Sequence, residues 1–184
     1  MAGNKLELLK QEIQYYIGLP YSKNILKDRK IIKEQFLGGK GNYRQIAAET
    51  IRLAQKQKID LVKLTNQEFY NFQKKNHLGI DCSGLVCQLL NFYFNAKLEP
   101  RKISASMLTS SPISQEITDL NDLQTGDLIR QKNGHHVLFI IEKTSNIINY
   151  VESSLSGRGV KYGKANITDK SFKHQGFYRL FFLD

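Results

Sequence analysis

Apolar residues lie three or four positions apart in the first part of the chain, which is the spacing of one helix face. One such set ends at Gly18-Leu-Pro20, a sequence that stops a helix, and consists of Leu6, Leu9, Ile13, Tyr16 and Ile17. The spacing returns from Tyr43 to Ala54, and the capping-box sequence Thr65-Asn-Gln-Glu68 predicts a third helix that runs to about Lys75. The chain is therefore expected to open with amphipathic helices.

Two stretches depart from this spacing. From Ser22 to Gly41 the chain is basic and then glycine-rich, which predicts an irregular loop with one short helix around Ile31 to Phe36. A continuous apolar run from Leu85 to Phe94 follows Gly79-Ile-Asp-Cys-Ser-Gly84 and is too long for most strands. It predicts a buried helix that starts near Cys82.

The second half of the chain changes to short β-branched or aromatic runs separated by Gly, Asn and Ser, the pattern of strands joined by turns. The expected strands are Asp127–Arg130, Val137–Ile141, Ile147–Glu152 and Phe177–Phe182. A Ser/Thr/Pro-rich loop from Ser104 to Ser114 is expected before them. Helices followed by strands predict an α+β fold, in which the helix at Cys82 packs on an antiparallel sheet.

Composition places the chain among ordinary folded domains. Its 184 residues, 41% hydrophobic, fit one domain over 1–184, and no run approaches the roughly 20 apolar residues of a membrane span. The residues from Met1 to Lys10 lack the apolar run of a secretory signal, which predicts a cytoplasmic chain unless a leader has been lost or export needs none.

The formal net charge of +10 favours anionic partners such as nucleic acid, anionic glycopolymers or acidic peptides. The lysines are nevertheless spread along the sequence, with no block of five like charges and no nucleic-acid motif. The charge therefore predicts a basic solvated surface that can contact an anionic glycopolymer, and no specific nucleic-acid site.

Cys82 and Cys87 are the two cysteines. On a helix they lie about 140° apart around the axis, so neither a disulfide nor a shared metal is expected, and no cofactor is indicated. Cys87 is deep in the apolar run and is expected to pack in the core. Cys82 is at the predicted helix start, where unpaired backbone N–H groups and the helix dipole favour a thiolate and can receive an oxyanion.

Asp81-Cys-Ser-Gly-Leu-Val86 resembles the signature of the NlpC family of papain-like cysteine peptidases, which hydrolyse peptide bonds in bacterial murein stems. Other parts of the chain resemble this family in the same order, namely Gly18-Leu-Pro-Tyr21, Gly126-Asp-Leu128 with Gly134-His-His-Val137, and Gly176-Phe-Tyr-Arg179. The resemblance implies a papain-like fold and a peptidase that cleaves the stem after a D-glutamyl residue.

The same resemblance implies the role of each site residue. Cys82 would attack the scissile carbonyl, and its backbone N–H would help to hold the oxyanion. His136 would act as the base, because it precedes Val137 directly, whereas His135 would point to the other side of the strand. Tyr21 would place its hydroxyl near the thiolate as a donor and substrate contact. Asp81 and Ser83 flank the nucleophile. By the same resemblance they would belong to the residues that bind the oxyanion and the substrate.

The third catalytic residue is where this sequence departs from the common family pattern. Much of the family has a histidine on the strand after the base, and here the candidates are Glu152 and Asn149. A two-residue turn at Ser145-Asn146 would place Phe139 opposite Glu152 and Glu142 opposite Asn149. Glu152 is then favoured, because it lies far from the turn, near the base. A turn of three or four residues would shift the register and leave Asn149 open as the third residue.

The segment from 22 to 78 separates Tyr21 from Cys82 by more residues than a compact catalytic core needs. This helical insertion is expected to cap the cleft or to dock another protein. Asp127 is expected to cap a turn, and Ser153-Ser154 with Gly157-Arg-Gly159 to form a loop that lines the cleft. Two alternative functions stay open, an amidase or acyltransferase with a non-murein substrate and an inactive binding module.

Overall fold

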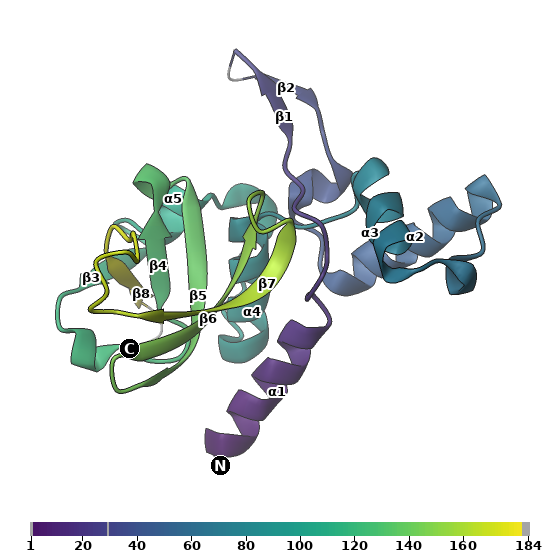
Figure 1. The fold of residues 1–184 in the computed structure, drawn as a ribbon. Coiled ribbons are helices and arrows are strands. Elements are labelled where there is room, and N and C mark those ends of the chain that lie inside the picture. The colour runs from purple at the N-terminus through teal and green to yellow at the C-terminus, as the bar shows by residue number, and fades with distance from the viewer. Residues whose placement is uncertain (1, 29, 182–184) are drawn as a thin grey trace.

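Helices form the N-terminal half of the chain and an antiparallel sheet the C-terminal half in the computed structural model, which describes residues 2–28 and 30–181 (Figure 1). The α-helices are α1 (Ala2–Gln14), α2 (Tyr43–Gln57), α3 (Asn66–Lys75), α4 (Cys82–Phe94) and α5 (Ala105–Leu108). The strands are β1 (Ile25–Lys27), β2 (Lys30–Lys33), β3 (Ser114–Ile117), β4 (Leu128–Gln131), β5 (His136–Thr144), β6 (Ile147–Ser154), β7 (Gly159–Asn166) and β8 (Phe177–Leu180). The α+β class expected from the sequence is confirmed.

The helix starts follow from side chains that cap free backbone N–H groups. Asn42 and Thr65 each form a reciprocal capping box with the residue three positions later, at the starts of α2 and α3. Asp81 caps α4, which ends at Asn95 in a left-handed conformation with φ of 54°. No helix within the described residues combines the length and apolar character needed to cross a bilayer.

A six-stranded sheet has the order β3-β8-β4-β5-β6-β7, and its neighbouring strands pair antiparallel. β5 and β6 form a hairpin in which Thr144 pairs with Ile147, so the expected two-residue turn at Ser145-Asn146 is confirmed. This hairpin matters for the site, because its open end carries His136 and Glu152.

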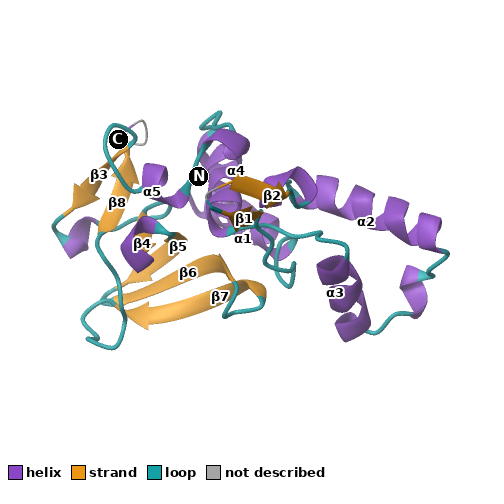
Figure 2. Cartoon of the chain, turned by 90° about the horizontal axis from the view of Figure 1, so that it is seen from above, coloured by secondary structure: helices purple, strands orange, loops and turns teal. Residues whose placement is uncertain are grey.

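Apolar residues on both faces of this sheet are buried. On one face, α4 and α1 pack against the sheet through a cluster that includes Leu9, Leu85, Leu89, Phe139 and Val151 (Figure 2). On the other face, a smaller cluster consists of Leu123, Ile129, Leu138, Ile140, Ile148, Ile167 and Phe177. The first cluster fixes α4 against the sheet, and with it the start of α4 at Cys82.

The segment predicted as a loop with a helix around 31–36 is instead a β-hairpin. β1 and β2 pair antiparallel, with Leu26 opposite Ile31, and a 3-10 turn at Phe36–Gly39 follows. The physical reason is the pair of β-branched residues Ile31 and Ile32, which favour extended backbone next to a strand that lies just before them in the chain. α2 and α3, by contrast, form as predicted and lie to one side, away from the C-terminal sheet (Figure 1).

Other local predictions in the C-terminal half were wrong. The expected loop from 104 to 114 contains α5, whose start is capped by the Ser104 side chain accepting from Met107 N. β3 and β7 were not expected, because they lie at the sheet edges, where polar and glycine residues replace an apolar run. The predicted end of the last strand at Phe182 lies outside the described residues.

Asp127 joins the turn before β4 to β8. Its carboxylate accepts from Gln124 N at 2.7 Å, which confirms the turn cap, and from Arg179 Nε and Nη2, each at 2.8 Å. The Asp127 side chain is 1% exposed and that of Arg179 16%. A buried bidentate ion pair therefore links two adjacent strands of the sheet.

We predict that Asp127→Asn lowers the free energy of unfolding by about 3 kcal/mol, because it removes the carboxylate charge from a largely buried ion pair with Arg179. The amide can still accept from Gln124 N, so the change removes the charge and keeps the cap. The matched control is Glu99→Gln, which removes one partner of an exposed ion pair with Lys102 and should cost under about 1 kcal/mol. Urea denaturation of both variants measures the difference, and equal losses would contradict the assignment.

Candidate active site

The Cys82 thiol lies at the first residue of α4 and is nearly buried, with 5% of the residue exposed. The Asp81 carboxylate accepts from Gly84 N at 2.6 Å. Among the described residues, none accepts from the backbone N–H of Cys82 or Ser83. The helix start therefore presents two free donors beside the thiol. Cys82 and Cys87 are not bonded to each other.

Lys40, a residue of the insertion, holds this helix start and was not among the site residues predicted from the sequence. Lys40 Nζ lies 2.9 Å from Asp81 Oδ1 and donates to Ser83 Oγ at 2.5 Å. Burial raises the pKa of Asp81, and the nearby Lys40 ammonium opposes that rise. The side chains of Asp81 and Ser83 are thus engaged in bonds that stabilise the start of α4. At this position the backbone N–H groups, and not these two side chains, are left to contact a substrate.

Glycine lets the Lys40 segment approach α4 closely. A Cβ at Gly84 would come within 2.6 Å of Gly39 O, and Gly39 O also accepts from Asp81 N at 2.8 Å. The absence of a side chain at Gly84 therefore makes room for the Gly39–Lys40 backbone. The glycine-rich stretch around Gly39 was the one sequence signal that could have indicated Lys40.

His136 begins β5 and is 5% exposed, whereas His135 is exposed. His136 Nε2 lies 2.7 Å from Glu152 Oε2 of β6. Glu152 Oε1 lies 3.4 Å from Lys161 Nζ of β7. Because Glu152 occupies Nε2, Nδ1 is the ring nitrogen left to face a second partner. His135 contributes its main chain, since its carbonyl oxygen lies 4.0 Å from Cys82 Sγ.

That second partner is Cys82, and the contact affects the pKa of His136. Burial lowers the pKa of His136, but hydrogen bonding to Cys82 and to Glu152, together with their charges, outweighs it and raises the pKa to about 9. Burial likewise raises the pKa of Glu152, and the hydrogen bond and charge of His136 lower it overall. The structure therefore brings Cys82, His136 and Glu152 together and favours the protonated imidazole at neutral pH.

This pairing also affects stability. The pKa of His136 in the folded chain lies above its ordinary value of 6.5. The pairing therefore contributes stability that is complete below about pH 6.5 and is lost as the pH rises through about 9. The pKa of Glu152 in the folded chain lies below its ordinary value of 4.5. Its contribution to the free energy of unfolding is therefore present above pH 4.5 and is lost as the pH falls through the lowered pKa.

The expected register of the β5–β6 hairpin was correct near the turn and wrong near the site. Glu142 pairs with Asn149 as predicted, but Phe139 pairs with Val151 and not with Glu152, because a bulge lies between Ile140 and Glu142. Continuing the observed register puts Glu152 opposite Leu138, two residues from His136 and on the same face of the strand. The bulge thus turns Glu152 toward His136.

Asn149, the alternative third residue, lies away from the cluster. Its Nδ2 donates to Glu142 Oε1 at 3.1 Å, close to the turn. Ser153 and Ser154 do not belong to a loop either, since both are buried in β6. Ser153 Oγ donates to Ile80 O at 2.6 Å and so links the sheet to the residues just before Cys82.

Tyr21 is half-buried and pairs in parallel with Ile80, two residues before Cys82. Burial raises the pKa of Tyr21, and the nearby Cys82 and Asp81 charges add to the rise. A cavity of about 390 Å³ adjoins Tyr21, between the base of the β1–β2 hairpin and Leu155 of the β6–β7 turn. Tyr21 thus lies beside both the thiol and a cavity.

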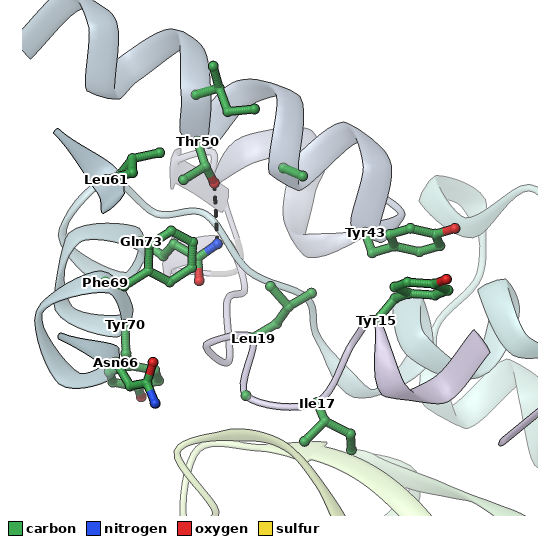
Figure 3. A pocket seen from close by; sticks show the side chains of 13 residues that line it. Tyr15, Ile17, Leu19, Tyr43, Thr50, Leu61, Asn66, Phe69, Tyr70 and Gln73 are labelled. Carbon is green, nitrogen blue, oxygen red and sulfur yellow. Dashed lines mark hydrogen bonds between the residues drawn. The ribbon is translucent and has the colours of Figure 1, made fainter. Parts of the chain in front are cut away.

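A larger cavity of about 680 Å³ lies elsewhere, between α2, α3 and the end of α1 (Figure 3). Tyr15 and Tyr43 stack at one side of it, with ring centroids 4.6 Å apart, and Gln73 donates to Thr50 across it. None of Cys82, His136 and Glu152 lines this cavity. It is therefore separate from the reacting groups.

Within the described residues, no cluster of three or more His, Cys, Asp and Glu side chains is arranged to hold a metal ion. Comparisons with family models, with curated proteins and with solved structures found no match to this chain.

We predict that Glu152→Gln lowers the pKa of His136 by about one to three units, because a neutral amide no longer stabilises the imidazolium. Asn149→Ala is the matched control on the same strand and should leave this pKa at about 9. NMR titration of the His136 ring signals, assigned with a His136→Gln variant, measures both. A pKa that responds to Asn149→Ala and not to Glu152→Gln would contradict the geometry.

Proposed function

We propose that this protein is a cysteine hydrolase of the papain-like NlpC type, with Cys82 as nucleophile, His136 as base and Glu152 as the residue that orients His136. One observation carries the proposal, namely the buried imidazole that bonds Glu152 at 2.7 Å and contacts the thiol at the start of α4. A nucleophile helix packed on an antiparallel sheet, together with the motifs that resemble this family, supports it.

We propose that the reactive state pairs a Cys82 thiolate with the His136 imidazolium. At neutral pH a His136 imidazole whose pKa is about 9 is protonated, so it can pair with a negatively charged sulfur. The free N–H groups at the start of α4 and the helix dipole stabilise the resulting negative charge on sulfur. Glu152 holds the ring so that Nδ1–H points toward Cys82.

Acylation begins when the Cys82 thiolate attacks the scissile carbonyl carbon and a C–S bond forms. The carbonyl oxygen becomes an oxyanion, which the backbone N–H groups of Cys82 and Ser83 receive. The His136 imidazolium then donates its Nδ1 proton to the amide nitrogen, the C–N bond breaks and the amine leaves. The product is a thioester on Cys82 and a neutral imidazole.

Deacylation uses the same groups in reverse order. The neutral His136 ring removes a proton from a water molecule, and the hydroxide attacks the thioester carbonyl. The second tetrahedral intermediate expels the Cys82 thiolate and releases a carboxylic acid. His136 retains the proton, so the ion pair is restored without any change of oxidation state.

The substrate follows from the family resemblance, which points to the murein stem peptide and the bond after its D-glutamyl residue. Tyr21 lines the 390 Å³ cavity and lies near the thiol, so it would contact the acyl part of such a peptide. An amidase or acyltransferase with a non-murein substrate would use the same three residues. The substrate test therefore separates these two functions, whereas loss of the thiol abolishes both.

We predict that the purified chain releases new amines from defined muropeptides, followed by mass spectrometry, and that Cys82→Ala slows the release at least about 10³-fold. The control is Cys87→Ala, which removes the other thiol from the core, and it should keep most of the activity once circular dichroism confirms folding. Cleavage of simple amides or thioesters but not of muropeptides would favour the amidase or acyltransferase. An unchanged rate in Cys82→Ala would exclude thiol catalysis.

A further inference from the structure

The β1–β2 hairpin projects from the rest of the molecule, away from the sheet and away from α2 and α3 (Figure 1). It carries four large aliphatic side chains in solvent: Ile25 is 40% exposed, Leu26 60%, Ile31 56% and Ile32 61%. Neighbouring aliphatic side chains that are exposed together on one protrusion mark an interaction site more often than scattered ones do.

The same hairpin is basic. Lys23, Lys27, Lys30 and Lys33 are exposed, and none of them forms an ion pair with another described residue. The acidic Glu34 at its base is already paired, because its carboxylate accepts from Arg101 Nη2 at 2.5 Å. The protrusion thus presents unpaired ammonium groups beside exposed aliphatic carbon.

Hydrogen bonds hold the base of the hairpin in place. Ser22 is buried, and its Oγ contacts Gln35 Oε1 at 2.5 Å and His77 O at 3.2 Å. Gln35 N donates to Asn24 Oδ1 at 3.2 Å, which joins the two arms. The exposed tip is therefore carried on a fixed base, and binding through it costs less ordering than binding through a free loop.

We infer that this hairpin docks the protein on an anionic lipid bilayer. The aliphatic side chains match the acyl region just below the headgroups, and the lysines match the phosphates of anionic lipids. A nucleic acid or an anionic glycopolymer would use the lysines but would leave the aliphatic side chains in water. A bilayer surface satisfies both properties at once, so it is the partner favoured by this combination.

Docking would bring the candidate site close to the bilayer. The 390 Å³ cavity lies at the base of the hairpin, and its lining includes Ile25 and Leu26 of the hairpin together with Tyr21 and Leu155. A chain held through Leu26 and Ile31 would therefore keep this cavity near the lipid surface. The inference does not rest on the proposed hydrolase activity, because lipid binding needs no thiol.

The test is co-sedimentation of the full chain with vesicles of phosphatidylcholine, with and without phosphatidylglycerol. The wild-type chain should bind the anionic vesicles, and binding should weaken as salt is added. Lys27→Glu with Lys30→Glu, and separately Leu26→Ser with Ile31→Ser, should each weaken binding at least about tenfold. Cys82→Ala should bind as the wild type does, so failure of the hydrolase proposal leaves this test intact.

Matched controls distinguish binding through the hairpin from non-specific binding through other surface lysines or exposed apolar side chains. Val62→Ser removes an aliphatic side chain that is 94% exposed outside the hairpin, and Lys170→Glu with Lys173→Glu reverses two exposed lysines outside it. Both controls should bind anionic vesicles as tightly as the wild type. The inference is overturned if the wild type does not bind, if the controls lose as much binding as the hairpin variants, or if the hairpin variants only abolish a dimer detected by light scattering.

Discussion

The contact between His136 and Glu152 is the interaction on which the rest of the site depends. A carboxylate 2.7 Å from Nε2 fixes the ring and raises its affinity for a proton, which leaves Nδ1 for the Cys82 thiol. Burial works against this arrangement, since it disfavours charge on the imidazole and on the carboxylate. The pair is charged because each partner stabilises the other more than burial destabilises it.

The start of α4 supplies the other half of the chemistry. The Asp81 carboxylate caps Gly84 N, and Lys40 neutralises that carboxylate. The N–H groups of Cys82 and Ser83 have no acceptor in the part of the chain that the structure describes. Lys40 comes from the 22–78 insertion, which also contacts the β6–β7 turn, where Tyr70 donates its hydroxyl hydrogen to Arg158 O at 2.7 Å. The insertion therefore supports the site as well as carrying the basic hairpin.

The sequence predicted the helices and the central strands because caps and apolar spacing are local signals. Cys82 at a helix start and His136 at a strand start were each identified from a short motif of neighbouring residues. The choice of Glu152 over Asn149 was reached through a register that the structure corrects, since a bulge between Ile140 and Glu142 shifts the pairing by one residue. A single bulge of this kind could not be predicted from the sequence, because its position depends on packing across the sheet.

Features that depend on contacts between distant segments of the chain could not be predicted from the sequence. Lys40 contacts Asp81 across 41 positions, and only a glycine-rich stretch indicated that the two segments come close. The β1–β2 hairpin was mistaken for a loop with a short helix, because its strands are too short to show a clear period. Its exposed aliphatic side chains have no role in folding that the described contacts explain, which is why a partner accounts for them best.

The ion pair between thiol and imidazole is the central claim, and site-resolved alkylation tests it most directly. Iodoacetamide at slightly acidic pH, read out by peptide mass spectrometry, reports the thiolate at each cysteine separately. The account predicts rapid alkylation of Cys82, none of Cys87 in the folded chain, and a marked slowing at Cys82 in His136→Ala. A Cys82 that reacts no faster than an ordinary thiol, or at the same rate without His136, would contradict it.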